Sequence, residues 1–139
     1  MSGLLDQSLE ELEHDRWPDP EWQSGLVLRV HQLRRKPIGQ LTTGDLKIMI
    51  SQNVGLRYLI PLALKIVEQN PLTEGDYFAG DLLQSLVNAD SLVIQKNLSL
   101  YRNVLHVIQK FKATIEANPE LRSRLLQFEE RISIVTNQH

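Results

Sequence analysis

A chain of 139 residues suits one domain and is long enough to bury a single core without a metal or a disulfide. Hydrophobic residues make up 42% of it and charged residues 23%, which is typical of a globular protein, and the absence of cysteine excludes disulfides and thiolate metal sites. The net charge of -2 predicts binding neither to nucleic acid nor to an anionic membrane.

The amino terminus lacks both the basic start and the apolar core of a secretory signal, which predicts residence in the cytoplasm. Charge is unevenly distributed along the chain. Residues 1–21 contain seven acidic residues and one basic residue, whereas the rest of the chain contains ten acidic and fourteen basic residues. An acidic end therefore precedes a mildly basic body.

A capping box formed by Ser8 and Glu11 predicts a short first helix from Ser8 to His14. Two nearby prolines end it, because the residue before a proline is disfavoured in the α region. Apolar residues at helical spacing then predict a helix over 21–36, whose last turn holds three cations that complement the helix dipole.

Thr42 and Asp45 have the spacing of a second capping box. A helix is therefore predicted from Thr43 to about Asn53. Gly55 is free to take a left-handed conformation that leads into the next helix.

The stretch 56–67 is apolar around nearly its whole circumference, and a helix of that kind must be buried. It is far shorter than the ~20 residues needed to cross a bilayer, so we expect a central core helix near residues 58–69. Pro61 allows two interpretations: a helix that starts near Ile60 after an irregular turn, or one kinked helix. The first is favoured, because proline is well tolerated in a first turn.

Downstream, apolar spacing predicts a helix over 81–88, a long amphipathic helix over 92–117, and a last helix that opens at Pro119 and folds back antiparallel. No pair of strands is evident. The predicted fold is all-α: a single compact bundle of about six or seven helices around the central apolar helix, in one domain over 1–139.

The sequence offers no constellation for catalysis. Neither a nucleophile elbow nor a phosphate-binding glycine loop is present. The four histidines show no metal-binding spacing: His14, His31, His106 and His139. We therefore expect no enzymatic activity, no metal and no cofactor.

The motif GDYFAGD at 75–81 has the composition of a ligand-binding loop, but a turn followed by an N-cap at a helix start is the favoured interpretation. The acidic segment has a similarly plain interpretation as a solvated helix surface. Trp17 and Trp22 lie in or beside it, however, and large aromatic residues next to charge are typical of interface centres.

Five sequence blocks follow one another in a fixed order. They are SLEELE with a following Trp17, RVHQLRRKPIGQLT at 29–42, DLKIMISQNVGL at 45–56, YLIPLALKIVEQNPL at 58–72 and GDYFAGDLL at 75–83. Together they resemble the helical immunity proteins of bacterial contact-dependent growth inhibition systems. The resemblance covers 8–87 and then fades. Two positions depart from the family's pattern: Ala79, where proline is common, and Lys47, where arginine is common.

The resemblance implies a cytoplasmic immunity protein that binds the toxic carboxy-terminal domain of its own strain's large cell-surface exoprotein. Many such toxins are nucleases with basic clefts, which an acidic surface would suit. The expected partner is this cognate toxin domain, and the chain itself is expected to be a monomer or a weak homodimer. The candidate toxin-binding residues are acidic and aromatic: Glu10, Glu11, Glu13, Asp15, Trp17, Asp19, Glu21, Trp22, Glu74, Asp76, Tyr77, Phe78 and Asp81.

A different class of function stays open, namely a helical adaptor or regulatory module that binds some other protein. An enzymatic function carries less weight, because no catalytic motif supports it. A toxin gene immediately upstream would support immunity, and its absence would favour the adaptor.

Overall fold

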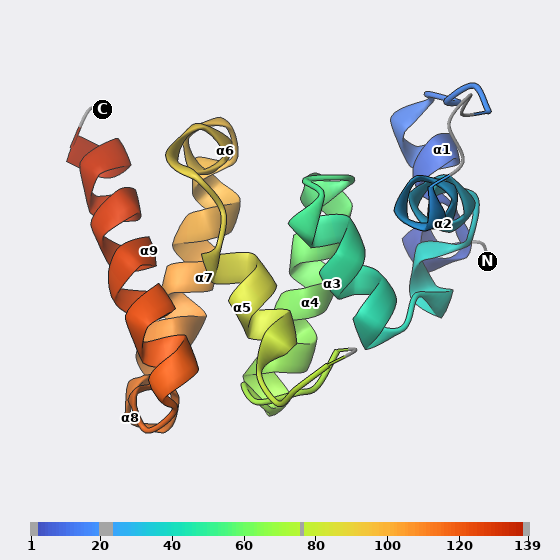
Figure 1. The fold of residues 1–139 in the computed structure, drawn as a ribbon. Coiled ribbons are helices and arrows are strands. Elements are labelled where there is room, and N and C mark those ends of the chain that lie inside the picture. Colours follow the sequence, from blue (N-terminus) through green and yellow to red (C-terminus); the bar gives the residue numbers. More distant parts are fainter. Residues whose placement is uncertain (1–2, 20–23, 76, 138–139) are drawn as a thin grey trace.

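The computed structural model describes residues 3–19, 24–75 and 77–137, and all regular structure within them is helical (Figure 1). The elements are η1 (Leu4–Asp6), α1 (Leu9–Glu13), α2 (Gly25–Arg34), η2 (Ile38–Gln40), α3 (Thr43–Ser51), α4 (Leu56–Gln69), α5 (Asp81–Val87), α6 (Ser91–Lys96), α7 (Leu98–Lys110), α8 (Lys112–Glu116) and α9 (Pro119–Asn137), where η marks a 3-10 helix. The all-α prediction is confirmed, although the described residues form nine α-helices rather than six or seven.

The predicted long helix over 92–117 is wrong, because the chain breaks it into α6, α7 and α8. Asn97 leaves the helical region at φ -130° and ψ 39°, and its side-chain amide donates to the Val93 carbonyl at 2.9 Å. Phe111, at φ -113° and ψ 22°, separates α7 from α8. Neither break involves glycine or proline, and the apolar rhythm continues across both, so periodicity alone predicts one helix.

Both predicted capping boxes are present. The Ser8 hydroxyl accepts from the Glu11 N–H at 3.3 Å, and the Glu11 carboxylate accepts from the Ser8 N–H at 3.0 Å. The same reciprocal pair joins Thr42 and Asp45, at 3.1 and 3.0 Å. These contacts satisfy N–H groups that lack an intrahelical acceptor, which explains where α1 and α3 begin.

α2 begins later than the expected start at residue 21. Ser24 is extended, at φ -72° and ψ 150°, and its hydroxyl accepts from the Val27 N–H at 3.2 Å. It is therefore the N-cap of the helix. Residues 20–23 lie outside the described part of the chain.

α3, α4 and α5 occupy the middle of the molecule, with α1 and α2 at one end and α9 at the other (Figure 1). α4 is the predicted central helix and packs against α3, α5 and α7. Its buried residues are Leu56, Leu59, Ile60, Ala63, Leu64 and Val67. Burial on all sides was nevertheless wrongly predicted, because an exposed stripe runs along the other side of α4: Arg57, Pro61, Lys65 and Glu68.

Pro61 lies inside α4, so the favoured helix start near Ile60 is wrong. Gly55, left-handed at φ 65°, is the N-cap of this helix. Proline cannot donate to the carbonyl of Arg57, one turn earlier, but both residues lie on the exposed stripe, where water can bind that carbonyl. The exposed position reduces the usual cost of ~3 kcal/mol for a proline within a helix.

α9 runs back antiparallel to α7, as predicted (Figure 1), and also packs against α5, α6 and α8. Its buried residues follow helical spacing: Leu121, Leu125, Phe128, Ile132 and Val135. Among the described helices, none is long and apolar enough to cross a membrane.

Candidate functional site

The structure places the candidate residues in two separate regions. We call them the amino-terminal region, residues 3–19 with α2, and the aromatic loop, residues 70–75 and 77–81. α1 lies at the upper right of Figure 1, whereas the chain between α4 and α5 lies at its lower edge. The candidates Glu21, Trp22 and Asp76 lie outside the described residues. The others therefore form two surfaces rather than one.

Leu9 anchors the amino-terminal region to the core. Its side chain is fully buried against the turn before α4, where a Cβ atom on Gly55 would lie 2.6 Å from Leu9 Cδ1. The Tyr58 hydroxyl of α4 donates to the Leu12 carbonyl at 3.3 Å. Packing and a hydrogen bond thus both hold α1 in place.

Arg35, the C-cap residue of α2, pairs with two of the acidic candidates. Its Nε donates to Glu10 Oε1 at 3.2 Å, and its Nη2 donates to Asp19 Oδ1 at 2.9 Å. The hydrogen bond and the charge of Arg35 hold the pKa of Asp19 below its ordinary value, and the hydrogen bond to Asp19 raises the pKa of Arg35. Because Arg35 and Asp19 are exposed, their pair contributes little to stability.

Arg34 is buried beneath Trp17, with only 1% of its surface exposed. Its guanidinium donates to the Glu13 carboxylate and the Asp15 carbonyl, and lies 4.1 Å from the centroid of the Trp17 ring. His31 meets the same tryptophan edge-on, with ring centroids 5.3 Å apart. A buried cation needs such partners, so one face of Trp17 is already occupied within the fold.

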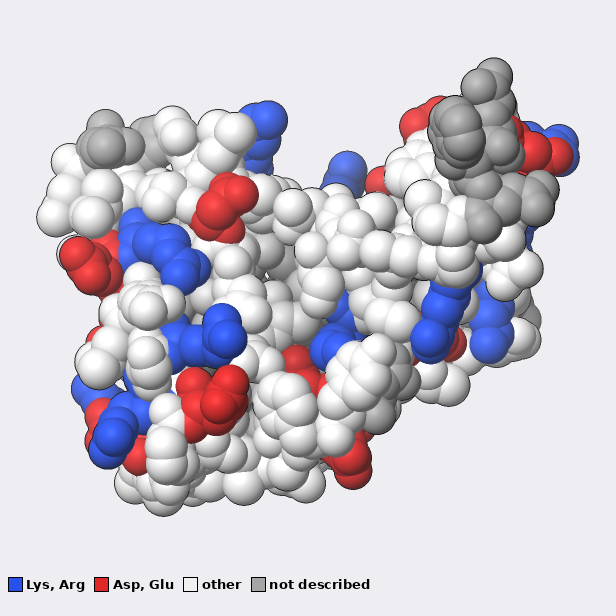
Figure 2. Space-filling model, viewed as in Figure 1, with Lys and Arg blue, Asp and Glu red and all other residues white. Residues whose placement is uncertain are grey.

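The amino-terminal region is more balanced in charge than its sequence suggests. Residues 22–41 contain four basic residues and no acidic one, and two of these bases pair with the acidic segment 1–21. Figure 2 shows acidic and basic side chains interspersed over the visible face rather than gathered in one acidic area. The Asp15 and Asp19 side chains stay exposed, so the acidic field that this region offers a partner is modest.

Asp81, the last residue of the aromatic loop, is buried and binds the backbone of the loop through hydrogen bonds. Its carboxylate is 0% exposed and accepts from the N–H groups of Gly75 and Tyr77, the latter at 2.9 Å. Lys47 Nζ of α3 lies 4.0 Å from Asp81 Oδ2. The predicted turn and helix start are present, but the N-cap of α5 is Gly80, so Asp81 serves the loop instead. Its burial means that it can affect a contact surface only by shaping this loop.

The aromatic loop exposes two large side chains. Tyr77 is 74% exposed and Phe78 is 39% exposed. Lys47 Nζ lies 4.0 Å from the centroid of the Tyr77 ring. Glu74 is also exposed, and its carbonyl accepts from Thr43 Oγ1 at 3.0 Å. Exposed aromatic residues on a held loop are characteristic of protein contact surfaces.

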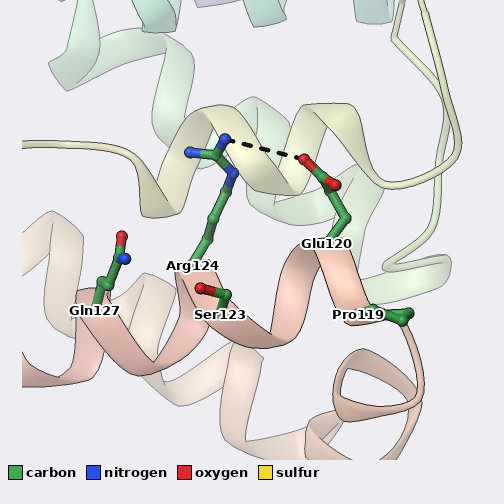
Figure 3. A pocket seen from close by; sticks show the side chains of 5 residues that line it. All are labelled: Pro119, Glu120, Ser123, Arg124 and Gln127. Atoms are coloured by element: carbon green, nitrogen blue, oxygen red, sulfur yellow. Dashed lines mark ion pairs between the residues drawn. The ribbon is translucent and has the colours of Figure 1, made fainter.

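A hollow on α9 offers no comparable surface. Its lining is largely polar: Pro119, Glu120, Ser123, Arg124 and Gln127 (Figure 3). Arg124 lies 3.9 Å from Glu120 and donates to Asn88 Oδ1 at 3.0 Å. The guanidinium is therefore engaged within the chain, and the hollow has the character of solvated helix surface.

Two kinds of group bear on catalysis: clusters of side chains that could bind a metal ion, and titratable side chains with a shifted pKa. The described ranges contain no group of three or more His, Asp or Glu side chains that could hold a metal ion. Burial, followed by the charge of Asp90, raises the pKa of Tyr101 to about 12. The Tyr101 hydroxyl is thus neutral at physiological pH, and its ring packs against Phe128 in the core, with centroids 6.2 Å apart.

Three basic residues make contacts with the candidate toxin-binding residues but were not themselves predicted as candidates: Arg34, Arg35 and Lys47. Arg34 and Arg35 were explained by the helix dipole, although the opposite charges of residues 1–21 and 22–41 were an available signal for their pairing. For Lys47 we find no such signal, because its partners Tyr77 and Asp81 lie far along the chain.

Comparison with known families covers most of the chain. A family model described as CDI immunity proteins matches residues 11–104. The match runs from α1 into α7, and so extends beyond residue 87, where the resemblance of the sequence blocks fades. No curated protein matches the chain.

Proposed function

The chain belongs to the family of CDI immunity proteins, and we propose from this membership that it binds and neutralises the carboxy-terminal toxin domain of its cognate contact-dependent growth inhibition exoprotein. The observation that carries the proposal is the family match over residues 11–104. We further propose that it acts in the cytoplasm as one domain, by binding alone and without a chemical step of its own.

The aromatic loop is our proposed centre of the contact. Tyr77 and Phe78 are the exposed aromatic side chains of the described residues, and binding energy in protein interfaces is concentrated in such residues. The amino-terminal region has a secondary role in this proposal. Arg34 covers one face of the Trp17 ring, and most of the acidic side chains in this region pair with a base or cap a helix.

The chemistry of the loop favours a recess in the toxin domain that is apolar inside and basic at its edge. Tyr77 and Phe78 would fill the apolar part, and Glu74 would meet the cations. A nuclease cleft has this character, because it stacks bases and binds phosphate. We therefore propose a toxin of the nuclease class, inhibited by occupation of its cleft.

The test is binding to the toxin domain encoded immediately upstream, produced as a catalytically inactive variant. We expect co-purification, and a dissociation constant in the nanomolar range by calorimetry. A toxin domain from another strain is the matched control and should not bind. If the toxin is a nuclease, a substrate oligonucleotide should compete with the immunity protein.

The outcome also separates the two function classes. Protection of cells that express the toxin should accompany binding in solution. A chain that neither binds the upstream toxin domain nor protects cells contradicts the proposal and favours the adaptor function.

A further inference from the structure

We propose that Asp81 and Lys47 are positioning residues, which hold the aromatic loop so that Tyr77 and Phe78 are already arranged for capture before a partner arrives. The inference rests on the proposed function, because it explains how the loop is prepared for the toxin domain.

The first support is the hydrogen bonding of Asp81. Among the described residues, its Oδ1 accepts from the Gly75 N–H and its Oδ2 accepts from the Tyr77 N–H. Asparagine has nearly the same shape but only one accepting oxygen. An exchange to Asn therefore releases one of the two backbone N–H groups and removes the negative charge that faces Lys47.

The second support is the position of Lys47. Its ammonium lies 4.0 Å from Asp81 Oδ2 and 4.0 Å from the centroid of the Tyr77 ring. The side chain is only 17% exposed, so this cation is partly shielded from water. Shielding from water strengthens the attraction of the cation to a carboxylate and to an aromatic ring. It links the buried carboxylate to one face of the exposed ring and leaves the rest of that ring accessible.

The third support is the space around Gly75. A Cβ atom there would lie 2.8 Å from Asp81 Oδ1 and 3.2 Å from Lys47 Cδ. The backbone of the loop thus approaches the Asp81 carboxylate more closely than a side chain permits, and it leaves only a tight space beside Lys47. Alanine at this position should push the loop away while Asp81 and Lys47 stay intact.

The loop is also fastened at other points. The Gly80 N–H donates to the Leu72 carbonyl at 3.0 Å, and Gly80 itself is left-handed at φ 88°. The Thr43 hydroxyl of α3 holds the Glu74 carbonyl. A loop whose described residues are restrained at several points, and which still exposes two aromatic side chains, is suited to binding with little ordering.

Ordering matters because each residue that becomes fixed on association loses conformational entropy, and this loss opposes binding. A loop that is fixed beforehand avoids this loss. Loosening the loop should therefore weaken binding even though every contacting side chain is still present.

The experiment compares Asp81→Asn, Gly75→Ala and Lys47→Met with the unaltered chain. Hydrogen exchange at the Gly75 and Tyr77 amides reports the free protein, and calorimetry with the inactive upstream toxin domain reports binding. Asp81→Asn and Gly75→Ala should speed local exchange and weaken binding, each by on the order of tenfold, and Lys47→Met by about threefold. Lys65→Met, at an exposed lysine of α4, is the control and should change neither readout.

Tyr77→Ala distinguishes the possible failures. Weaker binding by Tyr77→Ala, with normal exchange and normal binding by the other variants, would overturn the positioning role and leave the contact surface intact. An unaltered chain that fails to bind the toxin domain overturns the proposed function itself. If Asp81→Asn does not fold, Gly75→Ala and Lys47→Met decide the question by the same two readouts.

Discussion

The amino-terminal region and the aromatic loop combine charge with aromatic residues in different ways. In the amino-terminal region, charged side chains pair with one another and a tryptophan covers a buried arginine. In the aromatic loop, a buried carboxylate and a partly buried lysine lie beneath exposed aromatic rings. Arg34 is buried under Trp17 and bound to Glu13. Asp81 and Lys47, in contrast, support an exposed Tyr77. Both regions place an aromatic ring over a cation, but Trp17 is half-buried whereas Tyr77 is 74% exposed.

The difference shows that charge and aromatic content do not by themselves identify a contact surface. Acidic residues that attract a partner must keep their charge unpaired and exposed. Most of those in the amino-terminal region contribute to the fold instead. Four experiments test this difference between the two regions.

Replacing Arg34 with alanine should produce the largest effect, on stability. Breaking a buried ion pair typically costs ~3–5 kcal/mol, and we expect about 2–3 kcal/mol here because Glu13 can turn toward water. The exposed Arg102→Ala is the control and should stay within about 0.5 kcal/mol. Urea unfolding measures both. Unchanged stability of the Arg34 variant would remove the structural role given to this region.

Replacing Tyr77 with alanine should weaken toxin binding by about 2 kcal/mol, or roughly thirtyfold, without affecting the melting temperature. The ring is 74% exposed, so the fold does not depend on its burial. Leu92→Ala, at a leucine of α6 that is 59% exposed, is the matched control for the loss of exposed apolar surface. Equal toxin affinity of these two variants would show that the contact lies outside the aromatic loop.

Asp45 stands at the start of α3, between the two regions, and should make stability depend on pH. Burial opposes its ionisation, but hydrogen bonds from Thr42 and Arg29 outweigh it and lower the pKa of Asp45 below the ordinary 3.8. Its contribution is therefore present above about pH 4 and is lost as pH falls through the lowered pKa. Asp45→Asn should cost roughly 1 kcal/mol near neutral pH and nothing in strong acid. A difference that persists in strong acid would show that the ionised carboxylate is not its cause.

Exchanging Asp15 and Asp19 for asparagine should produce the smallest effect. These exposed acids can act on a basic partner mainly through long-range attraction, so association should slow by about twofold at low salt and not at high salt. Surface-binding kinetics at two salt concentrations provide the test, with Glu74→Gln as the corresponding change in the loop. A loss of affinity larger than that of Tyr77→Ala would reverse the roles of the two regions.

Features set by neighbouring residues were predictable from the sequence. The capping boxes at Ser8 and Thr42 start helices where expected, because the hydrogen bonds involved span only three residues. The central position of α4 followed from its apolar density. Its exposed stripe was missed because Tyr58, Leu62 and Ile66, which are only partly buried, made the helix look apolar on all sides.

Features set by distant residues were not predictable in the same way. The pairing of Arg35 with Glu10 and the contact of Lys47 with Asp81 depend on how helices pack, which spacing along the chain does not reveal. The helix breaks at Asn97 and Phe111 have no glycine or proline to mark them. The candidate list therefore contained the exposed aromatic residues but lacked the cations placed around both regions.

In the aromatic loop, the residues that fasten the backbone differ from those that face solvent, so partner choice and folding can change independently. The bonds to Asp81 come from backbone N–H groups, which every residue except proline supplies. If the loop contacts the toxin domain as proposed, substitutions at Glu74, Tyr77 and Phe78 should alter which toxin is recognised while the bonds that hold the backbone persist. On that proposal the protein could follow a diverging toxin by small steps, and a library varied at these three positions would test whether new inhibitor specificities arise.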